Sequence, residues 1–172
     1  MRFSEPLPLV LAAAKGEFNF PGPARWNLCI SHRKRVQLNA QLNVLFKPEG
    51  AVFIPDKRKR SAQGAWRRTC GSGRGSSSWG VSEKKGVRNQ VLYEVAEVNQ
   101  NTVHFAGGVS LTHEQVSEWT VLSFAQTYAS CQGTDFEGTL RLHDTTHKFF
   151  TRRHLFVGLS RAKASGAVDV RD

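Results

Sequence analysis

The sequence predicts an α/β fold, in which helices cover a mainly parallel sheet and a small antiparallel β element is inserted. Three observations indicate this fold. Short apolar runs of strand length alternate with segments of helical periodicity towards both ends of the chain. A central stretch instead alternates apolar and polar residues on both sides of a turn, as antiparallel hairpins do. The 172 residues, of which 40% are hydrophobic, are enough for one domain with its own core.

The N-terminal part predicts a strand–helix–strand unit after a short helix. The first helix is predicted over residues 6–16, with prolines near its first turn. An apolar strand over 27–31 precedes a helix over 33–46, and Ser31 is placed to cap that helix. A second apolar strand over 51–55 completes the unit, which is the building block of parallel sheets.

The middle of the chain changes character. Residues 57–80 contain seven Lys and Arg residues and are rich in Gly and Ser, so they bury too little apolar surface to repay their ordering. We expect a basic flexible loop there. Residues 86–105 predict two antiparallel strands joined by a turn. A short helix over 111–119 should follow, with Thr112 and Gln115 at capping-box spacing.

The last 50 residues show the clearest pattern. A buried strand is predicted over 121–130, a second strand over 139–144, a helix over 149–163 and a final strand over 166–170. The chain then divides into five segments: a lead-in over 1–26, the first part of the α/β domain over 27–56, the basic loop over 57–80, a small β insertion over 81–122 and the second part of the α/β domain over 123–172.

The chain is strongly basic. Its 24 Lys and Arg residues against 14 Asp and Glu give a formal charge of +10, which favours a polyanionic partner, most simply nucleic acid. No apolar run approaches the ~20 residues that span a bilayer, so a membrane partner is not expected. The three cysteines lie far apart and form no C-x-x-C pair, which favours a reducing, intracellular location in the cytoplasm or nucleus.

Four stretches resemble, in the same order, the second motor domain of superfamily 1 DNA helicases of the RecD-like and viral type. CISHRKRVQLNAQLN is similar to the strand and helix that open that domain, and RNQVLYEV to a hairpin of its small β-barrel. TYASCQGTDF resembles the motif T-x-H-x-x-Q-G-x-[ET]-[FL], and FVGLSRAK resembles the closing YVALSRAR. The resemblance covers about residues 27–170 and implies a RecA-like parallel sheet with a small antiparallel β-barrel insertion.

The resemblance also implies site residues. Arg161, within LSRA, matches the family's arginine finger, which would stabilise the charge on a transferred phosphoryl group. Gln132, Gly133 and Asp135 match positions on the nucleotide side, where a glycine lets backbone N–H groups approach a phosphate. Thr127 is placed near the DNA backbone by the resemblance alone. By residue type alone, an arginine that pairs with a carboxylate at a helix end is the commoner explanation of Arg161, and the LSRA context reverses this preference.

A second predicted surface is basic and would contact single-stranded DNA. Arg33 and Arg35 follow the first strand together with Lys34, and Trp66 and Trp79 flank the basic loop as stacking platforms for bases. A solvated basic loop with partly packed tryptophans explains the same pattern.

The sequence departs from the family at several positions. Ala129 and Ser130 stand where the family often has His and Lys, and Gln90 replaces a glycine. No G-x-x-x-x-G-K-[ST] occurs, and the glycine-rich stretch over 70–78 has no lysine at the place that a phosphate cradle requires. We therefore expect ATP and Mg²⁺ only in a complete two-domain enzyme, in which a P-loop motor domain acts in cis or in trans. By itself the chain should bind no cofactor and hydrolyse no ATP.

The functional hypothesis is thus the C-terminal motor portion of an ATP-dependent DNA helicase. The alternatives are a non-catalytic, basic nucleic-acid-binding module and a degenerate helicase fragment in which the segment 57–80 is out of frame. Two further patterns are weaker. His143 and His147, with Cys131 upstream, are similar to the tail of a zinc finger that lacks its first cysteine pair. Cys131 with a nearby histidine is also a conceivable nucleophile.

Overall fold

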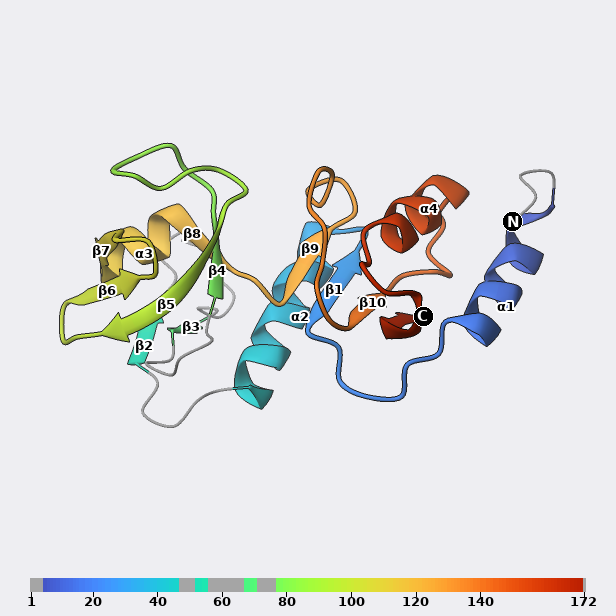
Figure 1. Cartoon of the computed structure of the whole chain (residues 1–172), viewed down its shortest axis with the longest axis horizontal. Coiled ribbons are helices and arrows are strands. Elements are labelled where there is room, and N and C mark those ends of the chain that lie inside the picture. Colours follow the sequence, from blue (N-terminus) through green and yellow to red (C-terminus); the bar gives the residue numbers. More distant parts are fainter. Residues whose placement is uncertain (1–4, 47–51, 56–66, 71–76, 172) are drawn as a thin grey trace. The chain divides into compact units, whose positions relative to one another are not determined.

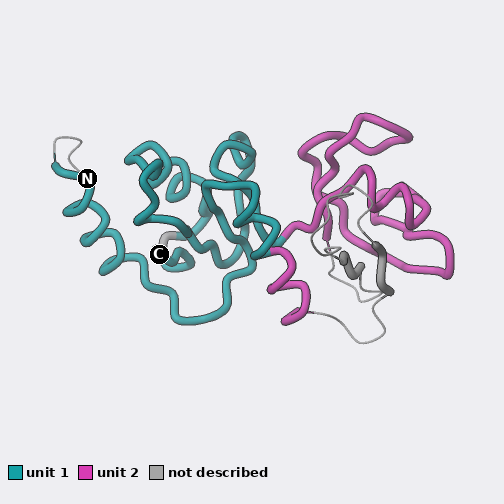
Figure 2. The backbone as a smooth tube through the Cα atoms, turned by 180° about the vertical axis from the view of Figure 1, so that it is seen from behind, with its two compact units in different colours: residues 1–38, 124–172 teal, residues 39–123 magenta. Residues whose placement is uncertain are grey.

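The computed structural model describes residues 5–46, 52–55, 67–70 and 77–171. The chain forms two compact units, which Figure 2 distinguishes by colour: unit 1 consists of residues 1–38 and 124–172, and unit 2 of residues 39–123. Unit 2 is therefore an insertion in the sequence of unit 1. Unit 1 contains a parallel sheet and unit 2 a separate antiparallel sheet, so the predicted fold class is confirmed.

Unit 1 is built on a four-stranded parallel sheet in the order β11-β10-β1-β9 (Figure 1). Leu28 in the central strand β1 pairs with Leu142 on one side and with Gln126 on the other. All four residues of β1 are buried, as is typical of parallel strands that are covered on both faces. The strands are β1 (Trp26–Cys29), β9 (Ala125–Thr127), β10 (Leu140–Leu142) and β11 (Val168–Val170).

The helices of unit 1 follow the sequence pattern closely. The helix α2 begins at His32, and Ser31 Oγ accepts a hydrogen bond from Lys34 N at 3.1 Å, which confirms the predicted cap. Residues of α2 from 39 onward belong to unit 2. In the part of the chain that the structure describes, no helix is long and apolar enough to cross a membrane. The helical elements of this unit are α1 (Leu7–Glu17), α2 (His32–Leu45), α4 (Arg152–Ser160) and the 3₁₀ helix η1 (Ser165–Ala167).

Helix α4 lies very close to strand β10. A Cβ atom added to Gly158 would lie 2.6 Å from Leu142 Cδ2, and Leu142 is fully buried. The glycine is therefore required by this contact, because any side chain would displace either the leucine or the helix. The contact positions the C-terminal end of α4, where Arg161 is found.

Unit 2 contains a five-stranded antiparallel sheet in the order β7-β6-β5-β4-β8. A short helix, α3 (His113–Trp119), connects β7 to β8. Its capping box is present as predicted, since Thr112 Oγ1 accepts from Gln115 N and Gln115 Oε1 accepts from Thr112 N. The strands are β4 (Ser77–Gly80), β5 (Leu92–Val98), β6 (Thr102–Phe105), β7 (Ser110–Thr112) and β8 (Thr120–Leu122).

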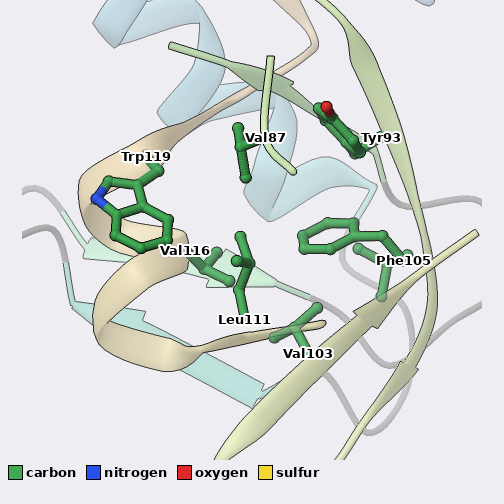
Figure 3. Packing of buried hydrophobic residues seen from close by; sticks show 8 residues of the cluster. Val87, Tyr93, Val103, Phe105, Leu111, Val116 and Trp119 are labelled. Atoms are coloured by element: carbon green, nitrogen blue, oxygen red, sulfur yellow. The ribbon is translucent and has the colours of Figure 1, made fainter. Parts of the chain in front are cut away.

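The core of unit 2 lies between the sheet and α3, and Figure 3 shows its side chains pointing towards one another. Tyr93 and Val95 alternate with exposed residues along β5, so they reach the core from the same face of the strand. The Tyr93 hydroxyl donates to Gly86 O and accepts from Arg88 N, which satisfies its polar end. The buried cluster consists of Val87, Tyr93, Val95, Val103, Phe105, Leu111, Val116 and Trp119.

The strand predicted over 51–55 exists but has a different partner. It is β2 (Val52–Pro55), which pairs antiparallel with β3 (Arg67–Cys70) and does not join the parallel sheet. The expected strand–helix–strand unit is therefore wrong. The reason is that the chain leaves unit 1 within α2, so the next strand belongs to unit 2.

Two other expectations differ from the structure. The segment 57–80 was expected to be a loop, but it contains β3 and β4, and β4 lies inside the five-stranded sheet between β5 and β8. Residues 56–66 and 71–76 lie outside the described residues. The single strand predicted over 121–130 is in fact two strands, β8 and β9, which belong to different units. The insertion accordingly extends over residues 39–123, wider than the predicted 81–122.

Candidate functional site

The predicted nucleotide-side residues lie on a tight turn after strand β9. The chain turns over residues 128–133, with Cys131 N donating to Thr127 O at 3.1 Å and Thr134 N donating to Cys131 O at 3.0 Å. Gly133 has φ +83°, in the left-handed region that favours glycine, and no atom lies within 4 Å of the position of its missing Cβ. Gln132 and Gly133 are exposed. The turn thus presents an open backbone to solvent.

The end of α4 is attached to the segment that follows this turn. Phe136 N donates to Arg161 O at 2.7 Å, and Lys163 N donates to Phe136 O at 3.2 Å. Phe136 is buried, and its ring lies 5.3 Å from that of Trp26 in β1. These contacts fix the backbone of Arg161 beside the turn, although the two segments are far apart in the sequence.

The side chain of Arg161 points to the same segment. Its Nη1 lies 3.3 Å from Asp135 Oδ1, and its Nε and Nη2 each lie 3.4 Å from Ser160 Oγ. The side chain of Arg161 is 28% exposed and that of Asp135 is 63% exposed, so the ion pair is at the surface. The sequence allowed Arg161 to be either an arginine finger or the partner of a carboxylate. In the structure Arg161 pairs with the carboxylate of Asp135 and also lies beside the Gln132–Gly133 turn.

Thr127 is engaged within its own turn. Its hydroxyl donates to Ser130 Oγ at 3.0 Å and accepts from Ser130 N at 3.2 Å. Ser130 thus has a local structural role within the turn, at one of the two positions where the sequence departs from the helicase motif that it resembles. The neighbouring Ala129 is exposed and contributes no polar group.

The predicted nucleic-acid residues are only partly brought together. Arg33 and Arg35 lie in the first turn of α2, where Arg33 is exposed and Arg35 Nη2 lies 3.0 Å from His32 Nε2. Trp66 lies outside the described residues. Trp79 is only 6% exposed, so its proposed role as a stacking platform is wrong: its side chain is buried within unit 2.

A second group of polar residues lies where β1 and β10 end. His143 Nε2 lies 2.9 Å from Asn27 Oδ1, and Asn27 Nδ2 donates to the carbonyls of Ala24 and Phe124. Because the amide nitrogen is used in this way, Oδ1 accepts and the imidazole carries its proton on Nε2. Burial, followed by the charges of Lys34 and Arg141, lowers the pKa of His143 from 6.5 to about 4. His143 is therefore neutral at physiological pH.

The zinc and nucleophile hypotheses gain no support from this geometry. Within the described ranges, no group of three His, Cys, Asp or Glu residues could hold a metal ion. Burial raises the pKa of Cys131 to about 11, and its thiol donates to Tyr128 O at 3.3 Å. A buried, protonated thiol is a poor nucleophile, so Cys131 acts as a core residue.

The helix predicted over 149–163 begins later, at Arg152, so Phe149 and Phe150 lie in the turn that follows β10 and not in the helix. Asp144 has φ +63°, and its Oδ2 accepts from Ile30 N at 2.9 Å, so this turn is fixed to the end of β1. The adjacent pair Phe149–Phe150 was the sequence feature that could have drawn attention to this turn. Phe150 is buried, whereas Phe149 is 62% exposed.

No family model matches the chain, and no curated protein sequence matches it. The chain is, however, similar in structure to solved structures of Pif1. The chain is similar to Bacteroides Pif1 bound to ssDNA, with 17% identity and a TM-score of 0.59 over 95% of this chain and 44% of that one. It is also similar to Pif1 helicase from Bacteroides in complex with ADP-AlF3 and ssDNA, with 17% identity and a TM-score of 0.60 over 96% of this chain and 44% of that one.

A fungal structure shows the same likeness. Pif1 helicase from Candida albicans matches with 10% identity and a TM-score of 0.57, over 95% of this chain and 48% of that one. At these identities the likeness concerns the fold alone: the chain is folded like part of these Pif1 structures. The matched structures are Pif1 helicases, and the chain spans less than half the length of each.

Proposed function

We propose that the chain is the second, C-terminal motor domain of an ATP-dependent DNA helicase of the RecD-like type, and that Arg161 acts as its arginine finger. The observation that carries this proposal is the position of Arg161. Backbone hydrogen bonds through Phe136 hold it beside the turn of Gln132 and Gly133, with its guanidinium partly exposed. An arginine finger needs such a position, because it must reach a phosphate that another domain holds.

The ion pair with Asp135 is compatible with this role. Exposed ion pairs contribute less than about 1 kcal/mol, so a nucleotide phosphate competes easily for the guanidinium. The planar fork of arginine suits phosphate oxygens in the same way as it suits carboxylate oxygens. Asp135 would then hold Arg161 in place until the nucleotide arrives. Gly133 leaves room for a phosphate to approach the backbone N–H groups of the turn.

The nucleotide itself would be held mainly by a P-loop motor domain, in cis or in trans. The sequence has no G-x-x-x-x-G-K-[ST], so the residues that cradle ATP and Mg²⁺ are expected on that partner. The similarity to a Bacteroides structure that contains ADP-AlF3 supports nucleotide use by the complete enzyme. We expect the chain alone to bind no cofactor and to be inactive.

Single-stranded DNA is the proposed nucleic acid. The formal charge of +10 favours a polyanion, and two of the matched structures contain ssDNA. Arg33 and Arg35 at the start of α2, and Thr127 at the end of β9, are the described residues proposed to contact the strand. They follow the carboxyl ends of adjacent strands, β1 and β9, and so lie at the same edge of the sheet. A protein that acts on DNA would work in the cytoplasm or nucleus.

The test is reconstitution of ATP hydrolysis. The chain would be mixed with a separately produced P-loop domain encoded in the same genome, with oligo(dT) present, and phosphate release would be measured. Arg161→Ala should lower the turnover rate by about 1,000-fold or more, and Arg161→Lys should restore little, because lysine lacks the planar fork. Arg153→Ala is the matched control, since Arg153 is an exposed arginine on the same helix.

Two results would contradict the proposal. One is a DNA-stimulated ATPase activity of the chain alone, and the other is an Arg161→Ala variant that retains the rate of the wild type in the mixture. The competing function is a non-catalytic nucleic-acid-binding module, which the net charge and the missing P-loop motif favour. It predicts DNA binding without ATP hydrolysis in any such mixture.

A further inference from the structure

The turn after β10 holds one phenylalanine in solvent. His147 N donates to Asp144 O at 3.0 Å and Phe150 N donates to His147 O at 2.7 Å, so the turn is hydrogen-bonded along its length. Phe150 is buried against Tyr128, with ring centroids 5.7 Å apart. With its neighbour anchored in this way, Phe149 remains 62% exposed. A single exposed phenylalanine is ordinary at a protein surface, so only the groups around this ring can indicate a site.

Cationic and heteroaromatic groups surround this ring. Lys148 Nζ lies 4.9 Å from the centroid of the Phe149 ring, and the imidazole of His147 lies 5.4 Å from it. Phe149 N donates to His147 Nδ1, which fixes the imidazole beside the phenyl ring. An exposed aromatic face with a neighbouring ammonium group is the combination that binds bases and phosphates of single strands.

The chain neighbours of Phe149 line a groove, although Phe149 itself is not among its lining residues. The groove has a volume of about 500 Å³ and lies between α1 and the turn, with Lys148 and Phe150, the two neighbours of Phe149, among its lining residues. Leu7, Leu11 and Phe150 give it an apolar lining, to which Lys15 adds a second ammonium group. Within the described part of the chain, its lining contains no Asp or Glu. The groove is thus suited to a ligand with an apolar body and negative charge, and its volume is in the range of small-molecule sites.

The turn belongs to the same edge of the sheet as the proposed strand contacts. The hydrogen bond from Ile30 N to Asp144 fixes the turn to the end of β1, and Arg33 lies three residues further along the chain. All these residues belong to unit 1, as do α1 and α4; Figure 2 shows this unit in teal. The turn and the start of α2 therefore both lie near the end of β1, so one nucleic-acid strand is proposed to contact both.

We infer that Phe149 and the groove between α1 and the turn bind a nucleotide of single-stranded nucleic acid. A base stacks on the Phe149 ring or enters the apolar groove, and Lys148 binds the adjoining phosphate. Such binding tolerates any base, because every base has an aromatic face. The inference deepens the proposed function by naming a further contact for the same strand, but it requires neither ATP nor Arg161.

The test measures strand binding without any partner domain. Fluorescence anisotropy with fluorescein-labelled dT12 would compare the wild type with Phe149→Ala, Phe149→Trp and Phe156→Ala. Phe156 is the matched control, because it is 61% exposed and lies on α4, and its chain neighbours, unlike those of Phe149, do not line the groove. Phe149→Ala should weaken binding by about 5-fold to 100-fold, Phe149→Trp should bind at least as well as the wild type, and Phe156→Ala should be unchanged.

Two further measurements separate stacking from charge. A dT12 analogue without bases should bind wild type and Phe149→Ala equally. Lys148→Gln should weaken the binding of both dT12 and this analogue, and it should reduce the slope of log K against log salt by about 1. Ultraviolet crosslinking to dT12 followed by peptide mapping should place a crosslink within residues 145–150. Equal binding of dT12 by Phe149→Ala and wild type would overturn the inference, and so would an equal loss with Phe156→Ala.

Failure here and failure of the proposed function are distinguishable. Binding of dT12 is measured on the chain alone, whereas the role of Arg161 is measured only by ATP hydrolysis in the reconstituted mixture. A chain that binds dT12 through Phe149 but never supports hydrolysis would retain this inference and refute the motor function.

Discussion

The guanidinium of Arg161 meets the carboxylate of Asp135 at 3.3 Å, on a surface where Asp135 is 63% exposed. The same unit contains a buried counterpart. Arg141 Nε donates to Asp169 Oδ2, and the Asp169 side chain is 2% exposed. Asp169 Oδ2 also accepts from Arg171 Nε at 2.8 Å, so the buried carboxylate has two arginine partners, whereas the exposed Asp135 is paired with Arg161.

The two pairs should differ sharply in their contribution to stability. Arg161→Ala should change the free energy of unfolding by less than about 1 kcal/mol, because water already solvates both charges. Arg141→Ala should cost more, about 1.5 to 3 kcal/mol, because it removes one of the two arginine partners of a buried carboxylate and a donor from Gly22 O. Urea unfolding followed by circular dichroism measures both. A large loss of stability in Arg161→Ala would show that Arg161 has a structural role.

Gly158 should tolerate no side chain. A Cβ atom at this position would lie 2.6 Å from Leu142 Cδ2, so Gly158→Ala should destabilise the protein by about 1 to 3 kcal/mol despite the better helix propensity of alanine. Gly16→Ala in α1 is the matched control, because nothing lies within 4 Å of its Cβ position. It should be neutral or stabilising by up to about 1 kcal/mol. Thermal unfolding of the two variants measures the difference, and equal melting temperatures would refute the close contact.

Stability should fall below neutral pH through His143. Its pKa is about 4 in the folded protein and 6.5 when unperturbed, so the unfolded chain takes up the proton first as the pH falls. The stabilising contribution is complete above pH 6.5 and is lost as the pH falls towards 4. It amounts to roughly 2 kcal/mol after allowance for partial solvent access. In urea unfolding between pH 7.5 and 4.5, the free energy of unfolding should depend less steeply on pH for His143→Gln than for the wild type. Equal pH dependence of the two proteins would contradict the lowered pKa of His143.

Two cysteines should resist alkylation in the folded protein. Burial, followed by the charge of Asp144, raises the pKa of Cys29 to about 12, and burial raises that of Cys131 to about 11. At pH 8 neither thiol is ionised to a useful extent, and both are fully buried. Iodoacetamide labelling with peptide mapping should find both unmodified in the native protein and both modified in urea. Rapid native labelling of Cys131 would revive its role as a nucleophile.

Local patterns predicted local structure well. The capping box of Thr112 and Gln115, the Ser31 cap and the helix that contains Gly158 all depend on residues a few positions apart, and all are present. The association of Arg161 with the turn of Gln132 and Gly133 was anticipated only through the resemblance. Nothing in residue spacing brings these segments together, because the contact depends on the packing of Phe136.

Long-range pairing was beyond the sequence pattern. The apolar strand Val52–Pro55 looks like a parallel strand, but its partner is set by an insertion that begins inside α2, where the helical periodicity continues without a break. The division of residues 121–130 between two units has the same origin. Phe149 is exposed and Phe150 is buried, and the turn that holds them is hydrogen-bonded along its length. Because the two residues are identical and adjacent, the sequence does not show which of them is buried.

The insertion of unit 2 also determines the order in which the chain can fold while it is being synthesised. The hydrogen bond between Asn27 and Phe124 joins residues 97 positions apart, and that between Asn27 and His143 joins residues 116 positions apart. Strand β1 therefore leaves the ribosome long before either of its neighbours exists, whereas every strand of the antiparallel sheet has emerged by residue 123. During that interval the apolar segment Trp26–Cys29 has no strand to pair with, and it is the place where we expect chaperones to bind the nascent chain.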